Sequence, residues 1–333
     1  MRITVLGAGS WGTTVASVLT RRDHESLLWA RSPATADQIN AEHTNKRYLE
    51  GFPLPARLRA TADLAEAAGH AELLVVGVPT GAFRDTLERV RPDLHPWIPV
   101  VSLSKGLERD SLLRMTEVIK EVLPGHPAAA LTGPNLAKEI MAGMAAATVI
   151  ATEDLTVATA IQQVFRRGLL RVYINHDVIG CEVGGALKNV VAIATGIAQG
   201  LGVGDNTRAG VISRGLAELT TLAVAMGGEP GTLAGLAGMG DLVATCISPQ
   251  SRNRYVGEQL GRGRKLDDIL GEMGQVAEGV KTVHAAVQLA DRHGLAMPIT
   301  RTIHRVITGD LTAAQAYGGL LRTHPAGHES EPG

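Results

Sequence analysis

Short apolar runs alternate with helical patterns through the first half of the chain, and this alternation stops near residue 176. The predicted strands cover 2–7, 26–30, 72–78, 99–104, 128–133, 147–152 and 170–175. The predicted helices between them cover 11–21, 81–91, 110–122, 135–142 and 154–165. Strands that are apolar throughout must be buried on both faces. The pattern therefore predicts a doubly wound α/β fold, with helices covering both faces of a parallel sheet.

The second half of the chain shows only helical patterns that are rich in Ala, Gly and Leu. They cover 178–200, 207–226, 232–237, 252–260, 265–271, 278–293, 298–307 and 311–322. A chain of 333 residues is long enough for two domains of ordinary size. We expect an α/β domain over 1–176, an all-helical domain over 177–322 and a flexible tail over 323–333.

Composition and charge exclude several classes of protein. The net charge is −1 and there is no long basic run, so neither nucleic acid nor an anionic membrane is an expected partner. The two cysteines, Cys181 and Cys246, can form at most one disulfide, which fits a reducing cytosol where both stay free. The apolar N-terminus is interrupted by glycines, and no stretch approaches 18 unbroken apolar residues. We therefore expect a cytoplasmic protein without a signal peptide or a membrane-spanning helix.

A glycine-rich turn, Gly7-x-Gly9-x-x-Gly12, directly follows the first predicted strand and opens a predicted helix. The first glycine permits a tight turn, the second lets the backbone approach a pyrophosphate, and the third lets the helix pack closely on the strand. Free N–H groups at the helix start can bind the phosphates. The alternative is a plain βα turn, but the strand, the helix and the position at the start of the chain together favour a Rossmann-type dinucleotide-binding domain.

The residue at the end of the second predicted strand indicates whether the cofactor is NAD or NADP. An NAD-selective site would usually show Asp or Glu there to hold the ribose 2′-hydroxyl. Instead the chain has Arg31 with Ser32 beside it, and an arginine suits a 2′-phosphate and stacks on adenine. A surface arginine at a strand end is the alternative. We expect NADP to be used well, with NAD as a second possible cofactor.

Polar residues follow two predicted strands at the edge where parallel sheets bind ligands. Lys105 comes directly after the strand 99–104, so it is expected to point toward the cofactor crevice. A solvated loop lysine is the alternative. One strand later, Gly133 lies in a turn, Asn135 can cap the next helix, and Ala137 keeps its first turn open. A cap alone would explain Asn135.

Lys188 lies in the middle of the small, mostly apolar run "CEVGGALKNVVAIATG" of 181–196, with no acidic residue three or four positions away. On a helix it would share a face with small residues, among them Gly184 and Gly185, which leaves room for another molecule. A structural lysine would reach water or pair with a carboxylate. We predict that burial lowers its pKa from about 10.4 toward roughly 7–8, where lysine exchanges protons at neutral pH.

Two later stretches suit an anionic substrate. "SPQSRNRYVG" starts a helical pattern with guanidinium groups at its N-terminus, a place that favours phosphate. Its candidate residues are Ser251, Arg252, Asn253 and Arg254. In "GMGDLVATC", Asp241 could hold Lys188 in place or accept a hydrogen bond from a substrate hydroxyl. Helix caps at Asp241 and Ser251, and a solvated Arg252, are the alternatives.

Two kinds of catalytic motif are absent from the sequence. It contains neither HExxH nor a clustered set of Cys and His, so we expect no metal and no zinc-dependent alcohol oxidation. It also lacks a G-x-S-x-G elbow. The eleven histidines are scattered, and none is assigned to chemistry.

Distinctive motifs run from residue 1 to about residue 322. They are "GAGSWGT", "WAR", "HTNKRYLEGFPLP", "SLSKGLE", "LTGPNLAKE", "DVIGCEVGGALKNVVAIATG", "GLGVGDNTRAG", "GMGDLVATC", "SRNR" and "AEGVKT". Together they closely resemble the bacterial NAD(P)-dependent sn-glycerol 3-phosphate dehydrogenases. "EVGGALKN" with "GDNTRA" is far more specific than the glycine turn. The resemblance implies a Rossmann domain and a helical domain that interconvert glycerol 3-phosphate and dihydroxyacetone phosphate for phospholipid synthesis.

The resemblance also implies roles for individual residues, with Lys188 as the proton acceptor. The implied nucleotide contacts are Ser10, Trp11, Arg31, Lys105, Ala137, Arg252, Val276 and Glu278. The implied substrate contacts are Lys105, Gly133, Asn135, Asp241, Ser251, Arg252 and Asn253. Two positions depart from the family pattern: Asn135 stands where serine is common, and Ser32 where a bulkier residue is frequent.

We expect a dehydrogenase of a phosphorylated three-carbon alcohol, in which Lys188, Asp241 and Lys105 serve the reacting centre. Lys188 as ammonium would supply the proton when the C2 carbonyl is reduced, and as amine would take it in reverse. The partners of the protein would be the small-molecule substrate and a second copy of the chain in a homodimer. One rival is another two-domain dehydrogenase, of the 3-hydroxyacid or 6-phosphogluconate type, which lacks the "SKGLE" and "SRNR" combination. The other rival is a catalytically silent NADP-binding sensor.

Overall fold

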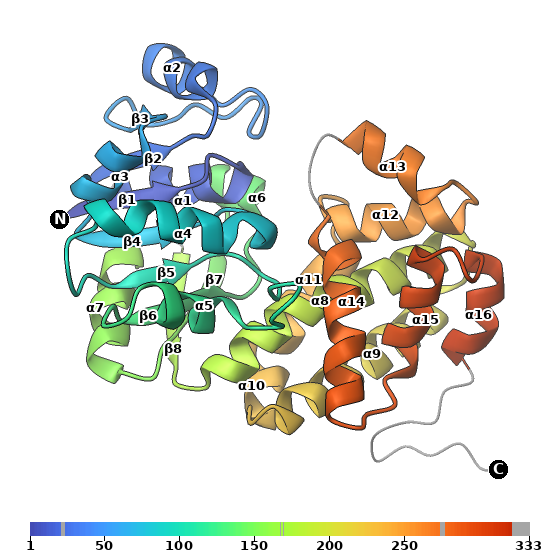
Figure 1. The fold of residues 1–333 in the computed structure, drawn as a ribbon. Coiled ribbons are helices and arrows are strands. Elements are labelled where there is room, and N and C mark those ends of the chain that lie inside the picture. Colours follow the sequence, from blue (N-terminus) through green and yellow to red (C-terminus); the bar gives the residue numbers. More distant parts are fainter. Residues whose placement is uncertain (21–23, 167, 169, 274–276, 322–333) are drawn as a thin grey trace. The chain divides into compact units, whose positions relative to one another are not determined.

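The computed structural model describes residues 1–20, 24–166, 168, 170–273 and 277–321 (Figure 1). The chain forms two compact units. Unit 1 comprises Met1–Ser104 and Met115–Val178, and unit 2 comprises Lys105–Arg114 and Ile179–Gly333. A single boundary near residue 176 would place all of 1–176 in one domain. The structure instead joins the short segment 105–114 to the helical unit. The predicted tail, 323–333, lies outside the described residues.

Unit 1 is built on one eight-stranded sheet. Its strands are β1 (Arg2–Leu6), β2 (Glu25–Trp29), β3 (Arg59–Thr61), β4 (Leu73–Val76), β5 (Val100–Ser102), β6 (Ala128–Thr132), β7 (Ala146–Ala151) and β8 (Leu170–Asn175). The strand order is β3-β2-β1-β4-β5-β6-β7-β8, so the chain winds outward in both directions from β1 and β4. The crevice of a doubly wound sheet lies at such a switch point, beyond the carboxyl ends of these strands. The predicted doubly wound fold is confirmed.

Two features of the sheet differ from the prediction. Strand β3 was not expected; its three residues contain no apolar run, and it forms by pairing with β2 at the sheet edge. Strand β7 runs antiparallel to β6, whereas the other pairs are parallel. The helix between them, α6 (Ala137–Met141), has five residues and spans only about 7 Å. A five-residue strand such as β6 spans about 16 Å, so α6 is too short to return the chain for a parallel pairing.

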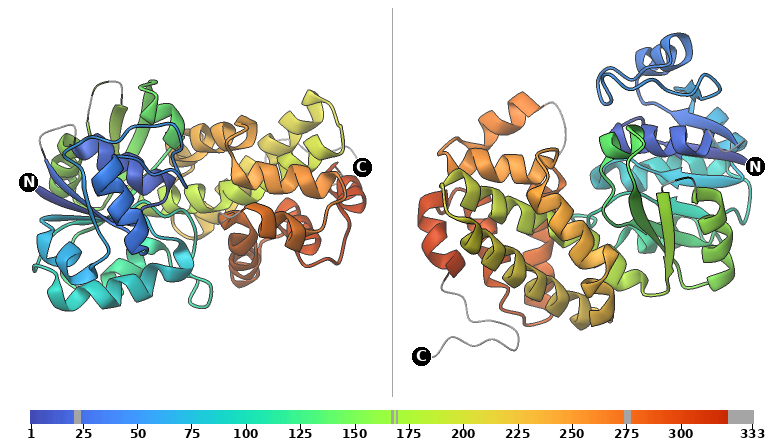
Figure 2. Two further views of the ribbon diagram at one scale, coloured as in Figure 1. Left: turned by 90° about the horizontal axis from the view of Figure 1, so that it is seen from above. Right: turned by 180° about the vertical axis from the view of Figure 1, so that it is seen from behind.

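Helices cover both faces of the sheet (Figures 1 and 2). They are α1 (Ser10–Thr20), α2 (Pro33–Glu42), α3 (Leu64–His70), α4 (Phe83–Val90), α5 (Met115–Val122), α6 and α7 (Leu155–Phe165), with single turns at Thr80–Ala82 and Arg91–Asp93. Helices α1, α6 and α7 pack together on one face, and α3, α4 and α5 on the other. The predicted helix 110–122 is wrong over its first turn, because α5 begins only at Met115 and the preceding residues belong to unit 2.

In the described residues of unit 2, the regular elements are helices, apart from the segment 105–114. Its helices are α8 (Val178–Gly200), α9 (Asp205–Ala225), α10 (Pro230–Ala234), a π-helical turn (Leu236–Gly240), α11 (Asp241–Ile247), α12 (Arg252–Gly261), α13 (Leu266–Met273), α14 (Glu278–Arg292), α15 (Pro298–Ile307) and α16 (Ala313–Leu321). The long α8 is central, because its residues contribute to both hydrophobic cores of this unit. The predicted helix 178–200 is therefore confirmed, whereas α11 was not predicted.

Glycines let α8 and α12 touch backbone to backbone. A Cβ added at Gly196 of α8 would lie 2.1 Å from the carbonyl oxygen of Arg254, and one added at Gly257 of α12 would lie 2.0 Å from that of Ile193. Real Cβ atoms do not approach so closely, so only glycine fits at these crossing points. This contact brings the start of α12 next to the middle of α8.

Helix α8 is also the described helix that is long and apolar enough to cross a membrane by length and composition. Its best 18-residue window has a mean hydropathy of 1.4, and 94% of that window is buried inside the structure. Glu182 and Lys188 interrupt its apolar residues, but these two charges lower the average hydropathy too little for the helix to fail this test. Its burial among the other helices makes it a core helix of unit 2.

Candidate active site

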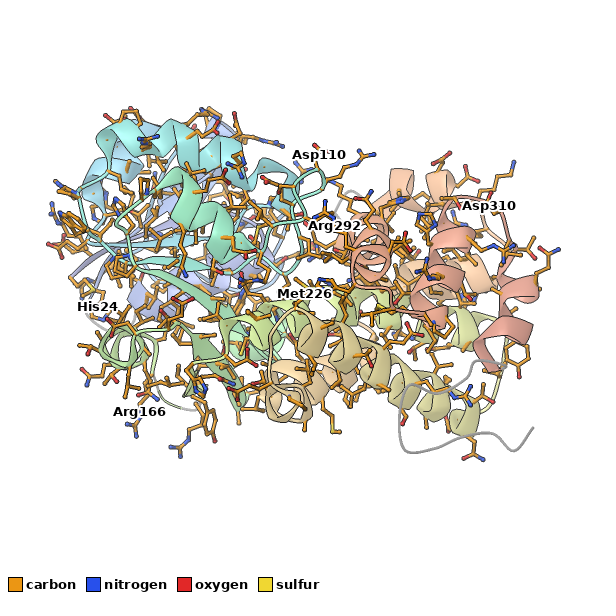
Figure 3. The ribbon with its side chains drawn as sticks, turned by 60° about the horizontal axis from the view of Figure 1, so that its bottom comes forward. His24, Asp110, Arg166, Met226, Arg292 and Asp310 are labelled. Carbon is orange, nitrogen blue, oxygen red and sulfur yellow. The ribbon has the colours of Figure 1, made fainter. Side chains whose placement is uncertain are left out.

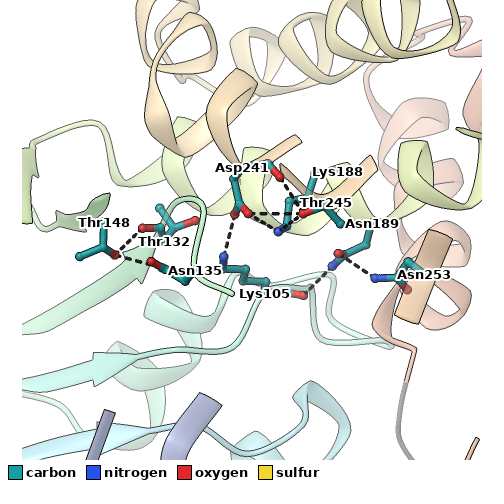
Figure 4. A network of polar contacts seen from close by, with 9 residues as sticks. All are labelled: Lys105, Thr132, Asn135, Thr148, Lys188, Asn189, Asp241, Thr245 and Asn253. Carbon is teal, nitrogen blue, oxygen red and sulfur yellow. Dashed lines mark hydrogen bonds and ion pairs between the residues drawn. The ribbon is translucent and has the colours of Figure 1, made fainter. Parts of the chain in front are cut away.

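Two lysines share one carboxylate in unit 2 (Figure 4). The Nζ of Lys188 donates hydrogen bonds to Oδ1 of Asp241 and, at 2.7 Å, to Oγ1 of Thr245. The Nζ of Lys105 donates to the other oxygen of Asp241, Oδ2, at 2.7 Å. The side chains of Lys188 and Asp241 are only 7% and 2% exposed. The partner that the lone lysine lacks within its own helix is therefore Asp241.

Each of these side chains is held by a separate element. Helix α8 carries Lys188, and α11 carries Asp241 and Thr245 one turn apart. Thr245 accepts the hydrogen bond from Lys188 and donates its own hydroxyl to the backbone oxygen of Asp241 at 2.6 Å. Asp241 is the first residue of α11 rather than its cap, which is Gly240. Its carboxylate therefore holds Lys188, one of the two roles expected from the sequence, and it also binds Lys105, which was not expected. Thr245 stood out in "GMGDLVATC" beside Asp241, but no role was predicted for it.

The environment makes Lys188 a group that can gain and lose a proton near neutral pH. Burial is the largest influence and lowers its pKa from 10.5 to about 8. The negative charge of Asp241 opposes this change, and the positive charge of Lys105 adds to it. The predicted depression of the lysine pKa is thus present. The neighbouring Cys246 behaves oppositely, because burial raises the pKa of its thiol to about 11 and keeps it protonated.

Two asparagines connect the lysine pair to the starts of α12 and α14. Asn189, directly after Lys188, donates to the backbone oxygen of Lys105 at 3.4 Å and accepts from Nδ2 of Asn253 at 2.9 Å. The Oδ1 of Asn253 accepts from the backbone N–H of Gly279 at 3.0 Å. Asn189 was missed by the sequence analysis, although its position beside Lys188 in "LKN" was the available signal.

The start of α12 is capped and carries one outward-facing arginine. Ser251 is its N-cap, with Oγ accepting from the N–H of Arg254 at 3.2 Å. Arg252 is exposed at the first position of the helix. Arg254 was expected to add a second guanidinium for an anion, and this is wrong. Its side chain is buried, donates to the backbone oxygen of Ser248 at 3.0 Å and pairs with Glu258 at 3.3 Å.

In unit 1, Asn135 was expected as a possible cap of α6, but the structure gives it another role. The N-cap of α6 is Leu136, which has no side-chain cap bond. Asn135 instead donates to Oγ1 of Thr148 at 3.0 Å, and Thr148 donates to the backbone oxygen of Thr132 at 2.7 Å (Figure 4). The Oδ1 of Asn135 is buried and has no hydrogen-bond partner in the described part of the chain. A ligand could satisfy that oxygen. Gly133, the other candidate here, lies in the turn after β6.

The glycine turn of unit 1 has the shape that a dinucleotide requires. Gly7 follows β1 with φ of 111°, and a Cβ at Gly12 would lie 2.0 Å from the Gly7 oxygen. Gly9 differs, because a Cβ placed there meets nothing within 4 Å. The first and third glycines are thus required for packing, and the second leaves its backbone open to a pyrophosphate.

The residues around this turn also fit a dinucleotide. Asn45, fully buried, donates to the backbone oxygen of Ala8 at 3.0 Å, and Ser10 donates to that of Tyr48 at 3.0 Å, so the turn is held from the side. The indole Nε1 of Trp11 is buried and has no partner among the described residues. Arg31 is exposed just beyond β2.

The remaining predicted nucleotide contacts are placed as follows. Ala137 is the first residue of α6 and packs against the core of unit 1. Glu278 is the first residue of α14, half-buried, in unit 2. Val276 lies outside the described residues. Within the parts of the chain that the structure describes, no three His, Cys, Asp or Glu side chains gather as ligands of a metal ion would.

Two family descriptions match the chain. The N-terminal region of NAD-dependent glycerol-3-phosphate dehydrogenase matches residues 2–158, and the C-terminal region matches residues 177–318. The chain belongs to this family.

Relatives of the glycerol-3-phosphate dehydrogenase family match it over its whole length. The NAD(P)+ enzyme of Sphingopyxis alaskensis is 55% identical over 333 residues, covering 100% of this chain and 99% of that protein. The one of Mycobacterium avium is 52% identical over 329 residues, covering 98% and 96%. Among solved structures, glycerol-3-phosphate dehydrogenase from Coxiella burnetii has a TM-score of 0.93 at 38% identity, covering 96% of this chain and 98% of that one.

Proposed function

We propose that the chain is an NAD(P)-dependent sn-glycerol 3-phosphate dehydrogenase, which interconverts dihydroxyacetone phosphate and sn-glycerol 3-phosphate. The observation that carries the proposal is the buried Lys188, held by Asp241 beside Lys105, with a pKa of about 8. A group that exchanges a proton near neutral pH is what an alcohol–ketone interconversion requires. The full-length relatives named for this activity support the same conclusion.

The residues of the chain supply the proton and hold the group that carries it, while bound NADPH or NADH supplies the hydride. In the reducing direction Lys188 as ammonium donates a proton to the oxygen on C2 of the substrate. In the oxidising direction Lys188 as amine accepts that proton. Asp241 and Thr245 hold its Nζ in place, so the proton is donated or accepted at a fixed position. Lys105 places a second positive charge beside that position.

We assign the substrate phosphate to the start of α12. The positive end of the helix dipole and the guanidinium of the exposed Arg252 both favour a dianion there. Ser251 and Asn253 fix this helix start, since one caps it and the other is held by Asn189 and Gly279. Gly133 and Asn135 are proposed as further substrate contacts, and the unpaired Oδ1 of Asn135 supports that assignment.

We assign the dinucleotide-binding domain to residues 1–176 and the substrate-binding domain to residues 177–322. The open backbone at Gly9, the buried Nε1 of Trp11 and the exposed Arg31 support a dinucleotide in the first region. Arg31 suits the 2′-phosphate of NADP, and the relatives named as NAD(P)+ enzymes support NAD as a second cofactor. Ala137, Val276 and Glu278 are proposed as additional nucleotide contacts. We further propose a cytoplasmic homodimer that serves glycerophospholipid synthesis, and sedimentation analysis tests the dimer.

The deciding experiment follows NADPH oxidation with dihydroxyacetone phosphate and, separately, with unphosphorylated dihydroxyacetone. We expect rapid oxidation with the phosphorylated ketone and a much lower kcat/KM with the other. In Arg252→Ala this preference should shrink, because the guanidinium that pairs with the phosphate is gone. No oxidation with the phosphorylated ketone, together with tight NADPH binding, would favour the silent sensor. Activity on a hydroxyacid alone would favour the other dehydrogenase class.

A further inference from the structure

The segment Lys105–Arg114 forms a small hairpin, which we call the tongue. A β-bridge pairs Leu107 with Arg114, and the N–H of Glu108 donates to the backbone oxygen of Leu113 at 2.9 Å. Its exposed turn includes Asp110, labelled in Figure 3. The chain enters the tongue after β5 and leaves it into α5, both of unit 1, yet the tongue itself belongs to unit 2. Strong contacts with the helices of unit 2 must therefore hold it.

Apolar side chains anchor the tongue in the core of unit 2. Leu107 and Leu112 are buried in the same cluster as Val183 and Leu187 of α8. Leu112 also adopts φ of 63°, a left-handed conformation that is unfavourable for leucine. Such a conformation persists only where the surroundings enforce it, which fits a side chain held in the core.

A buried ion pair anchors the base of the tongue. Nη1 of Arg114 donates to Oε2 of Glu182 on α8 at 2.8 Å, and their side chains are only 11% and 6% exposed. Lys105 begins the same base. Its ammonium reaches Asp241 at 2.7 Å, and its backbone oxygen accepts from Asn189. Because the bridge joins Leu107 to Arg114, the backbone of Arg114 is tied to a point two residues from Lys105.

We propose that the Arg114–Glu182 ion pair is a positioning device, which holds the tongue so that the Lys105 ammonium stays against Asp241 beside Lys188. The inference rests on the proposed function of that lysine pair. Arg114 and Glu182 need not touch the substrate; they act through Lys105 and are positioning residues.

The charged nature of the pair supports this role over simple packing. Two buried charges are expensive to desolvate, and apolar residues of similar size usually stabilise a core as well or better. An ion pair between a guanidinium and a carboxylate instead imposes direction and distance on the groups it joins. The apolar anchors Leu107 and Leu112 already hold the tongue to the core. The ion pair adds a defined position at the end of the tongue that carries Lys105.

If Lys105 is displaced, the pKa of Lys188 should change, and a purely structural role of the ion pair would not produce that change. The charge of Lys105 is one of the groups that lower the pKa of Lys188, whereas Asp241 raises it. Two further neighbours of Lys188 among the described residues, Thr245 and Cys246, carry uncharged hydroxyl and thiol groups. If Lys105 moves away from Asp241, the pKa of Lys188 should rise above about 8.

The test is the double variant Arg114→Met/Glu182→Met, which removes both buried charges at similar volume. Lys120→Met/Glu153→Met, which removes an exposed pair in unit 1, is the matched control. We expect the first variant to remain folded. Its kcat should fall roughly 10- to 100-fold, the loss expected when a reacting group is misplaced by about an ångström. The pKa of Lys188, from the Cε shift of labelled lysine in the free chain, should rise, and the control should match the wild type.

A folded double variant with wild-type kcat and an unchanged Lys188 pKa would overturn the proposal and leave the pair a structural feature. If the double variant does not fold, Glu182→Gln decides instead by the same two measurements, since it keeps the size and one acceptor oxygen. An unchanged pKa and kcat in that variant would also overturn the proposal. The pKa measurement needs no substrate. It therefore separates failure of this inference from failure of the proposed function, which would appear as an inactive wild type.

Discussion

Replacing Asp241 by Asn should move the pKa of Lys188 and, with it, the pH dependence of catalysis. In the folded chain burial lowers this pKa from 10.5 to about 8 even though the Asp241 carboxylate favours the ammonium. The difference corresponds to on the order of 3 kcal/mol against the charged form. Oxidation requires the neutral amine and reduction requires the ammonium. In the wild type, kcat/KM for oxidation should therefore rise with pH through about 8, and kcat/KM for reduction should fall.

The magnitude of the shift follows from the contact between the two charges. Unit charges about 3 Å apart interact by about 5 kcal/mol at an effective dielectric constant of about 20. Asn retains the shape and one acceptor oxygen of Asp241, but it has no charge. Because that acceptor oxygen still binds the ammonium, we take about half of this free energy as lost. The Lys188 pKa then falls by about 2 units. The rise in the oxidation profile should then move from about pH 8 to about pH 6.

The assay is the initial rate of NADP reduction with sn-glycerol 3-phosphate, measured across the pH range in which the variants stay folded. Lys105→Met is the matched variant, because removing the charge of Lys105 should raise the Lys188 pKa and move the profile to higher pH. Both variants should be slower than the wild type, so the midpoint rather than the rate is the readout. Midpoints that move in the same direction in both variants, or stay at the wild-type value, would refute the assignment of this titration to Lys188.

Three further predictions concern other parts of the chain. Lys188→Met should keep the fold and NADPH affinity while turnover falls roughly 10²–10⁴-fold, since the proton donor is lost; near-normal turnover beside unchanged fluorescence titrations would make Lys188 an ordinary helix lysine. Arg31→Glu should raise the KM for NADPH strongly and that for NADH little, and equal losses in steady-state assays with both cofactors would contradict a 2′-phosphate contact. Gly257→Ala should lower the free energy of unfolding by about 3 kcal/mol or more, because its Cβ would lie 2.0 Å from the Ile193 oxygen; a urea midpoint equal to that of the wild type would show that α8 and α12 can separate without cost.

Local features of the chain were predictable from the sequence because their causes lie within a few neighbouring residues. The glycine turn after β1 needs particular residues at Gly7, Gly9 and Gly12, and these can be recognised without knowing what packs on them. Helix α8 was predicted over its full length, because a helical pattern rich in small and apolar residues continues without a proline from Val178 to Gly200. The isolation of Lys188 within that helix, and hence its need for a distant partner, was equally visible.

The tertiary structure alone decided which groups meet. Lys188 is separated from Asp241 by 53 residues and Lys105 by 136, so no local pattern indicates that one carboxylate serves both. Arg254 and Arg252 look alike in "SRNR", yet only packing turns the first inward to Ser248 and leaves the second exposed. The transfer of the tongue to unit 2 has the same origin. Burial and long-range partners depend on how whole elements pack, whereas the sequence determines which elements form and which side chains they carry.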